Sequence, residues 1–132
     1  MGFVLELHGL VRWFVAVAAI AAIIKFALGW LRGMPYTAVD RGIMSAYTSL
    51  VDLNLLLGLI LFFGLGGGFP MPRIEHASTM IVAIIIAHLS AIWRKSEDAA
   101  KVFRNNLIVV ALSFALIISA VIILRGSWFF TK

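Results

Sequence analysis

Four long apolar runs, separated by short polar segments, account for most of the chain. The runs extend over residues 7–31, 43–65, 74–93 and 106–124. Each has about the 20 residues that a helix needs to cross the hydrocarbon core of a bilayer. Glycine and proline break the pattern most clearly at residues 66–72. The pattern predicts an all-α membrane protein, a single domain over residues 1–132, in which four transmembrane helices form an up-down-up-down bundle.

Composition and charge support a membrane location. The chain is 63% hydrophobic and 13% charged, whereas soluble domains are about 45–50% apolar and about 25% charged. The net charge of +5 comes from residues scattered at the ends of the apolar runs, where lipid head groups are the natural partners. We therefore expect the lipid bilayer as a partner and no nucleic acid. The lack of cysteine excludes thiolate metal sites and covalently attached c-type haem.

Lysine and arginine are distributed unequally between the two ends of the predicted bundle. The richer end has Lys25, Arg32, Arg41, Arg94, Lys95, Lys101 and Arg104, and the poorer end has Arg12, Arg73, Arg125 and Lys132. The richer end of a membrane protein faces the cytoplasm. Trp13 and Trp128 fall at the outer ends of their runs and Trp30 and Trp93 at the inner ends, as in an aromatic belt. We expect a multi-pass protein of the bacterial inner (cytoplasmic) membrane with both termini on the periplasmic side.

Two histidines stand near the starts of the first and third apolar runs. His8 and His76 should reach similar depths near the outer face, because the first and third helices of such a bundle run parallel. With neighbouring axes about 8–10 Å apart, the diagonal between them is about 13 Å, which suits an iron porphyrin between two imidazoles. We predict haem b with these histidines as ligands of the haem iron. Arg12 and Arg73 are the expected partners of its propionates, and Glu75 that of an imidazole N–H.

Two other readings of these histidines stay open. A histidine at a membrane surface is often only an amphipathic end group, as tryptophan and tyrosine are. Alternatively, Glu6, His8, Glu75 and His76 would make a mixed nitrogen and oxygen site for zinc, iron or copper. That site requires the two helix starts to be adjacent rather than diagonal.

A second group of ionisable residues lies deeper in the predicted spans. At 1.5 Å per residue, Lys25, Asp52 and His88 fall roughly 9–13 Å from the cytoplasmic ends of their runs. Such residues usually face a partner or a water-filled cavity. The structural interpretation is a Lys25–Asp52 ion pair with His88 hydrogen-bonded nearby. The functional interpretation is a site for a quinone head group or a proton relay.

Four segments resemble a known family. They are LHGLVRW at residues 7–13, KFALGWLRGMPYTAVDR at 25–41, LNLLLGLILFF at 53–63 and RIEHASTM at 73–80. Together they resemble the small four-span bacterial membrane proteins that are called cytochrome b-like, and the resemblance covers nearly the whole chain in order. The resemblance implies b-type haem, and the histidines of its pattern are His8 and His76.

These observations favour one function and leave an alternative. We expect a small integral membrane component of a bacterial respiratory or photosynthetic electron-transfer chain. It would carry haem b between His8 and His76, have contact with quinone, and catalyse no reaction of its own. The alternative is a haem-free accessory subunit that stabilises a larger membrane electron-transfer complex. The uncharged fourth run and the short connections favour packing against other membrane subunits.

Overall fold

The computed structural model describes residues 2–126 and residue 128, and every regular element in this part of the chain is helical. The elements are α1 (Gly2–Leu31), α2 (Ala38–Gly64), α3 (Met71–His88), the short 3-10 helix η1 (Leu89–Ile92) and α4 (Ala99–Arg125). Helices α1, α2 and α4, and α3 together with η1, are long and apolar enough to cross a membrane. The prediction of an all-α protein with four helices that are long and apolar enough to cross a membrane is therefore confirmed for the described residues. Lys132, counted above with the outer cations, lies outside the described residues.

The helices begin earlier than the apolar runs that predicted them. Helix α2 starts at residue 38 rather than 43, and α4 at residue 99 rather than 106. Polar capping residues stabilise both starts. The Asp40 carboxylate accepts hydrogen bonds from the backbone N–H and the hydroxyl of Thr37, and the Asp98 carboxylate accepts one from the Lys101 N–H. The capped first turn of each helix is polar and does not raise the local hydropathy. A prediction from the apolar pattern alone therefore places the helix start several residues too late.

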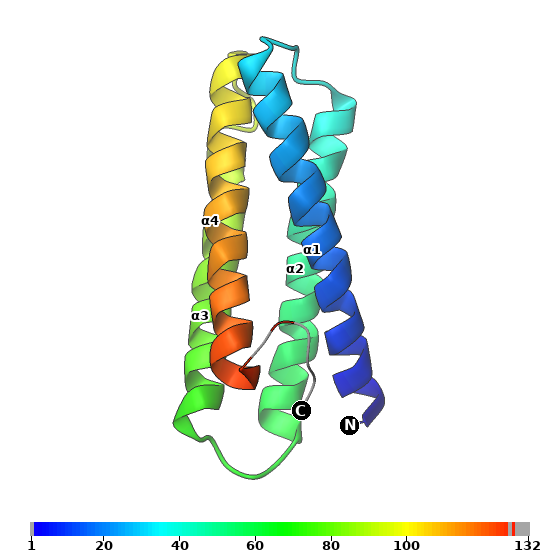
Figure 1. The fold of residues 1–132 in the computed structure, drawn as a ribbon, viewed down its shortest axis with the longest axis vertical. Coiled ribbons are helices and arrows are strands. Elements are labelled where there is room, and N and C mark those ends of the chain that lie inside the picture. Colours follow the sequence, from blue (N-terminus) through cyan, green and yellow to red (C-terminus); the bar gives the residue numbers. More distant parts are fainter. Residues whose placement is uncertain (1, 127, 129–132) are drawn as a thin grey trace.

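Figure 1 shows consecutive helices running in opposite directions along one long axis. The start of α1, the loop between α2 and α3, and the end of α4 lie together at one end, which we call the glycine-loop end after residues 66–68. Helix α1 packs against α2 and α4, while α3 packs against α4 and, less extensively, against α2. Helices α1 and α3 therefore face each other diagonally.

The helices are packed closely towards the end that is opposite the glycine loop. Ala16, Ala19 and Ala22 are buried along one side of α1, and such small residues let membrane helices approach closely. Further along α1, a Cβ atom at Gly29 would overlap the ring of Phe103 on α4. The Phe103 ring is fully buried. This half of the bundle is thus closed by direct side-chain contact.

Buried hydrogen bonds also connect the helices. The Tyr47 hydroxyl of α2 is 2.9 Å from the Ser113 hydroxyl of α4, which in turn donates to the Ala83 carbonyl of α3. Both side chains are fully buried. This chain of two hydrogen bonds joins three helices in the middle of the bundle, where no water is available to replace it.

The expected pair between Lys25 and Asp52 is wrong. The Lys25 ammonium of α1 lies 2.7 Å from the carboxylate of Asp40, whose side chain is fully buried. Asp40 reaches Lys25 because α2 begins before its predicted span and places its first turn beside the last two turns of α1. Asp52 instead bonds His88, at 2.7 Å.

We expect Asp40→Asn to lower the free energy of unfolding by about 3 kcal/mol, because removing one member of a buried ion pair leaves the other charge without a partner. The matched control is Asp52→Asn, which should cost at most about 1 kcal/mol, because the side-chain amide can still hydrogen-bond the His88 ring across the same contact. Unfolding in mixed micelles of the detergent-solubilised monomer, followed by circular dichroism, measures both. A larger loss for Asp52→Asn would contradict the assignment of the Lys25 partner.

Candidate cofactor site

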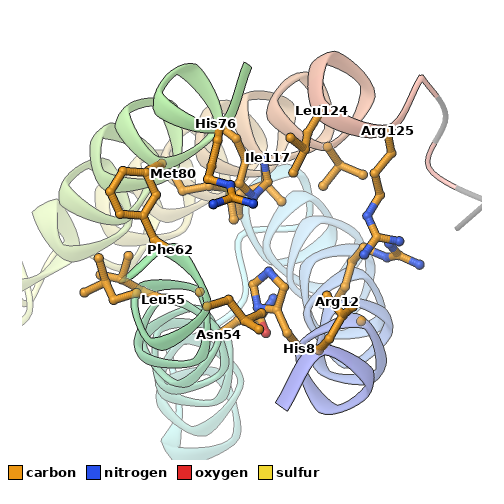
Figure 2. Close-up of a pocket in the computed structure, with 18 of the residues that line it drawn as sticks. His8, Arg12, Asn54, Leu55, Phe62, His76, Met80, Ile117, Leu124 and Arg125 are labelled. Carbon is orange, nitrogen blue, oxygen red and sulfur yellow. The ribbon is translucent and has the colours of Figure 1, made fainter. Parts of the chain in front are cut away.

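A cavity of about 330 Å³ enters the bundle at the glycine-loop end. All four long helices contribute to its lining, as Figure 2 shows. The volume lies within the range of pockets that hold small-molecule ligands, about 300–1,000 Å³. Most of the wall is apolar, with Leu55, Phe62, Met80 and Ile117 among its residues. The polar part of the lining consists of His8, Arg12, Asn54, Arg73, His76 and Arg125.

His8 enters the cavity from α1 and lies against a glycine of α2. A Cβ atom added to Gly58 would come within 3.2 Å of His8 Cε1, so the missing side chain leaves the space that the ring uses. Asn54, one turn earlier on α2, is a polar neighbour of the ring. Neither His8 Nδ1 nor Asn54 Oδ1 makes a well-formed hydrogen bond, although both atoms are buried. The imidazole is thus placed by packing against Gly58, and its Nδ1 atom makes no well-formed hydrogen bond.

His76 enters from α3, across the cavity from His8 (Figure 2). Its Nδ1 atom lies 3.0 Å from the Ala120 carbonyl oxygen of α4. A carbonyl only accepts hydrogen bonds, so Nδ1 carries the proton and Nε2 keeps its lone pair in the neutral ring. The expectation that Glu75 is the partner of an imidazole N–H is wrong: Glu75 is exposed, and the carbonyl of Ala120 takes this role.

Three arginines line the cavity, and they differ in what they bind. The Arg12 guanidinium lies 5.5 Å and 5.3 Å from the ring centroids of Trp13 and Trp128, and its Nε atom is buried without a hydrogen bond. Arg125 has a buried Nη1 atom that is also without a hydrogen bond. Arg73 is different, because its Nη1 atom donates to the carbonyls of Gly66 and Gly68 and so supports the glycine loop.

Unpartnered polar atoms are concentrated in this cavity. In the part of the chain that the structure describes, four buried side-chain atoms make no well-formed hydrogen bond: His8 Nδ1, Arg12 Nε, Asn54 Oδ1 and Arg125 Nη1. All four residues line the cavity. Each such group costs about 1–3 kcal/mol when it is left without a partner. Their concentration in one place indicates that the polar groups of this cavity are completed by water or by a ligand.

The structure brings together the residues of the predicted haem site and adds two that sequence reasoning missed. His8, His76, Arg12 and Arg73 all line the cavity. Arg125 and Asn54 were missed, because Arg125 reads as part of the polar tail and Asn54 as an ordinary position of the second run. A count from the run ends places Arg12 five residues inside the first run and Arg125 just beyond the end of the fourth, so the sequence carried no signal that brings these two residues together.

The other predicted groupings are not assembled. Glu6 and Glu75 are exposed and do not line the cavity with the histidines, so the four residues of the mixed metal site are not brought together. Lys25, Asp52 and His88 do not form one cluster either, since Lys25 is bonded to Asp40. Asp52 and His88 form a separate pair with about half of each side chain exposed.

Comparison of the chain with protein-family models, with curated proteins and with solved structures finds no match. The interpretation of the cavity therefore rests on its geometry and on the chemistry of the side chains that line it.

Two buried asparagines provide a test of whether the cavity is built for a ligand. Asn106 is bonded on both sides, since it accepts from Trp93 Nε1 and donates to the Tyr36 hydroxyl, whereas Asn54 Oδ1 makes no well-formed hydrogen bond and is only a polar neighbour of His8. In protein purified without ligand, Asn54→Leu should leave the free energy of unfolding unchanged or raise it by about 1 kcal/mol. Asn106→Leu should lower it by about 2 kcal/mol, because the Trp93 N–H loses its acceptor and the Tyr36 hydroxyl loses its donor. Equal losses in thermal unfolding would show that Asn54 is a structural residue.

Proposed function

We propose that the cavity binds haem b, with His8 and His76 as its axial ligands. The protein would then be a small integral membrane component of a bacterial respiratory or photosynthetic electron-transfer chain. The observation that carries this proposal is the convergence of two imidazoles, from diagonal helices, on one apolar cavity that contains all four unpartnered polar atoms. Haem, when bound, supplies a reversible one-electron carrier. The protein residues supply the ligands, the anion partners and a largely apolar cavity wall.

The two histidines have the properties that axial ligands need. The hydrogen bond from His76 Nδ1 to the Ala120 carbonyl orients the ring and leaves Nε2 free to bind a metal, an arrangement that is common for metal-binding histidines. His8 has a buried nitrogen without a partner, and Gly58 leaves space for its ring. Binding of iron would provide the interaction that the His8 ring lacks.

Arg12 and Arg125 are the residues that we assign to the carboxylates of the haem. Guanidinium groups form strong, paired hydrogen bonds with carboxylates, and both arginines have a buried nitrogen without a partner. Haem b has two propionates, so one arginine is available for each. This assignment replaces the expected role of Arg73, whose guanidinium is already bonded to the glycine loop.

We also propose that the helices cross the bacterial inner membrane as an up-down-up-down bundle with the glycine-loop end on the periplasmic side. The excess of lysine and arginine at the other end supports this orientation. The rings of Trp13 and Trp128 meet at a centroid distance of 6.0 Å, which is consistent with a shared depth in an aromatic belt. In this orientation the cavity opens towards the periplasm.

The haem proposal is tested by the reduced-minus-oxidised absorption spectrum of the purified protein. His8→Ala and His76→Ala should each abolish the b-type spectrum, because each variant removes one axial ligand. The matched control is His88→Ala, which removes a histidine outside the cavity and should leave the spectrum largely intact. Loss of haem only in His88→Ala would show that the pairing of His8 with His76 is incorrect. A wild-type protein that binds no haem would favour the accessory subunit.

Single cysteines test the orientation, because the chain has no cysteine of its own. Met71 is exposed at the start of α3, and Glu97 is exposed in the connection at the other end. A maleimide that does not cross membranes should label Met71→Cys from the periplasmic side of spheroplasts. Glu97→Cys should react only after the membrane is opened. The reverse pattern would place the cavity on the cytoplasmic side.

A further inference from the structure

Two of the four unpartnered polar atoms of the cavity belong to residues that are neighbours. His8 Nδ1 and Asn54 Oδ1 are both buried and make no well-formed hydrogen bond. The Asn54 side chain of α2 lies beside the His8 ring of α1 (Figure 2). The two atoms are chemically complementary, because a protonated ring nitrogen donates a hydrogen bond and an amide oxygen accepts one. Each residue thus carries the group that the other lacks.

The position of Asn54 in the chain is unusual for an amide. Asn54 is the one polar side chain in residues 53–63, LNLLLGLILFF, and it is only 5% exposed. A buried amide in a membrane-spanning helix is costly unless a partner satisfies it. The other buried asparagine, Asn106, satisfies this requirement through Trp93 and Tyr36. The packing of the bundle therefore accounts for Asn106 and leaves the amide of Asn54 unexplained.

The two histidines of the cavity differ in what holds the ring. A neutral imidazole has one protonated nitrogen and one with a lone pair. For His76, the Ala120 carbonyl oxygen lies 3.0 Å from Nδ1 and fixes the proton there. The Nδ1 atom of His8 has no such well-formed bond. Since α1 and α3 are diagonal, the acceptor for His8 has to come from a helix beside α1, and Asn54 is on one of these helices.

The geometry of the imidazole ring decides which nitrogen of His8 faces a ligand. Nδ1 is bonded to the ring carbon that joins the side chain to the backbone, and Nε2 is at the far end of the ring. The His8 ring points into the cavity (Figure 2), whereas Nδ1 is buried. Nε2 is therefore the nitrogen that offers its lone pair to a metal, and Nδ1 must then carry the proton.

We propose that Asn54 is the positioning residue of His8, and that Asn54 Oδ1 accepts a hydrogen bond from His8 Nδ1–H when Nε2 holds a metal. This inference rests on the proposed haem site. Gly58 provides the space for the ring to turn towards Asn54, because a Cβ atom there would come within 3.2 Å of His8 Cε1. A hydrogen bond of this kind orients the ring of a metal-binding histidine and makes its other nitrogen a stronger donor to the metal.

Asn54 then has for His8 the role that the Ala120 carbonyl has for His76. One axial ligand is oriented by a backbone group of α4 and the other by a side chain of α2. A single substitution can remove only the second of these acceptors. The inference also gives the amide of Asn54 a function that appears only when the cavity is loaded, which separates it from a residue that stabilises the fold.

Titration of the purified, haem-depleted protein with haemin tests the inference. Asn54→Leu should weaken haemin binding roughly 10–100-fold, the usual cost of losing the hydrogen-bond partner of a metal-binding histidine. Asn54→Asp is the conservative control, because its carboxylate keeps an acceptor oxygen in the same place, and it should bind haemin as tightly as the wild type. Circular dichroism confirms that each variant retains its helices.

Nuclear magnetic resonance of the reduced, haem-loaded protein labelled with ¹⁵N-histidine separates positioning from a general effect on the cavity wall. The wild type should show an Nδ1–H signal for both His8 and His76. Asn54→Leu should shift or broaden the His8 signal and leave that of His76 in place, since His76 bonds the backbone. Asn54→Asp should retain both signals.

The outcomes distinguish this inference from the haem proposal. Tight binding of haemin by Asn54→Leu, with an unchanged His8 signal, would show that His8 does not depend on the Asn54 side chain, and the haem site would stand without it. An equal loss of affinity in Asn54→Leu and Asn54→Asp would show that Asn54 only shapes the cavity. A wild-type protein that takes up no haemin would overturn the haem proposal and this inference together.

Discussion

A polar group in hydrocarbon can hydrogen-bond only to protein or to a ligand, and this constraint governs the arrangement of polar residues in the bundle. In the half opposite the glycine loop, Lys25 and Asp40 form an ion pair, and Asn106 bonds on both sides. Tyr47 and Ser113 bond each other in the middle. At the glycine-loop end the pattern changes, since four buried polar atoms around one cavity make no well-formed hydrogen bond. The first half has the properties of a structural core, and the second has those of a binding site.

The two histidines of the cavity are held by different helices and in different ways. Helices α1 and α3 are diagonal, so each ring is positioned by a helix that lies between them. His8 lies against Gly58 of α2, and His76 is bonded to the backbone of α4 at Ala120. The close packing of Gly29 against Phe103 fixes α1 relative to α4 at the far end of the bundle. The separation of the rings therefore depends on the packing of all four helices rather than on direct contact between α1 and α3.

The two aspartates of α2 differ in how completely the bundle encloses them. Asp40 is fully enclosed, with Lys25 and Thr37 as its partners, and its interactions are complete within one chain. Asp52, about 18 Å further along the same helix, is half exposed and has only His88. The same side chain thus has a fully buried ion pair at one position and a half-exposed pair at the other.

The sequence by itself determined that the protein is helical and has four helices long and apolar enough to span a membrane. Hydropathy is summed over consecutive residues, so it does not depend on which helices pack against one another. The alternation of these spans was also enough to predict that His8 and His76 would share one end, and in the structure both line one cavity. Only the tertiary structure decided the partners of individual polar groups: Asp40 rather than Asp52 for Lys25, and the Ala120 carbonyl rather than Glu75 for His76. Which partner a polar side chain reaches depends on how neighbouring helices are shifted and rotated relative to one another, and differences of a few ångströms are enough to change it. A polar capping turn that starts a helix several residues early shifts these offsets without changing the hydropathy pattern.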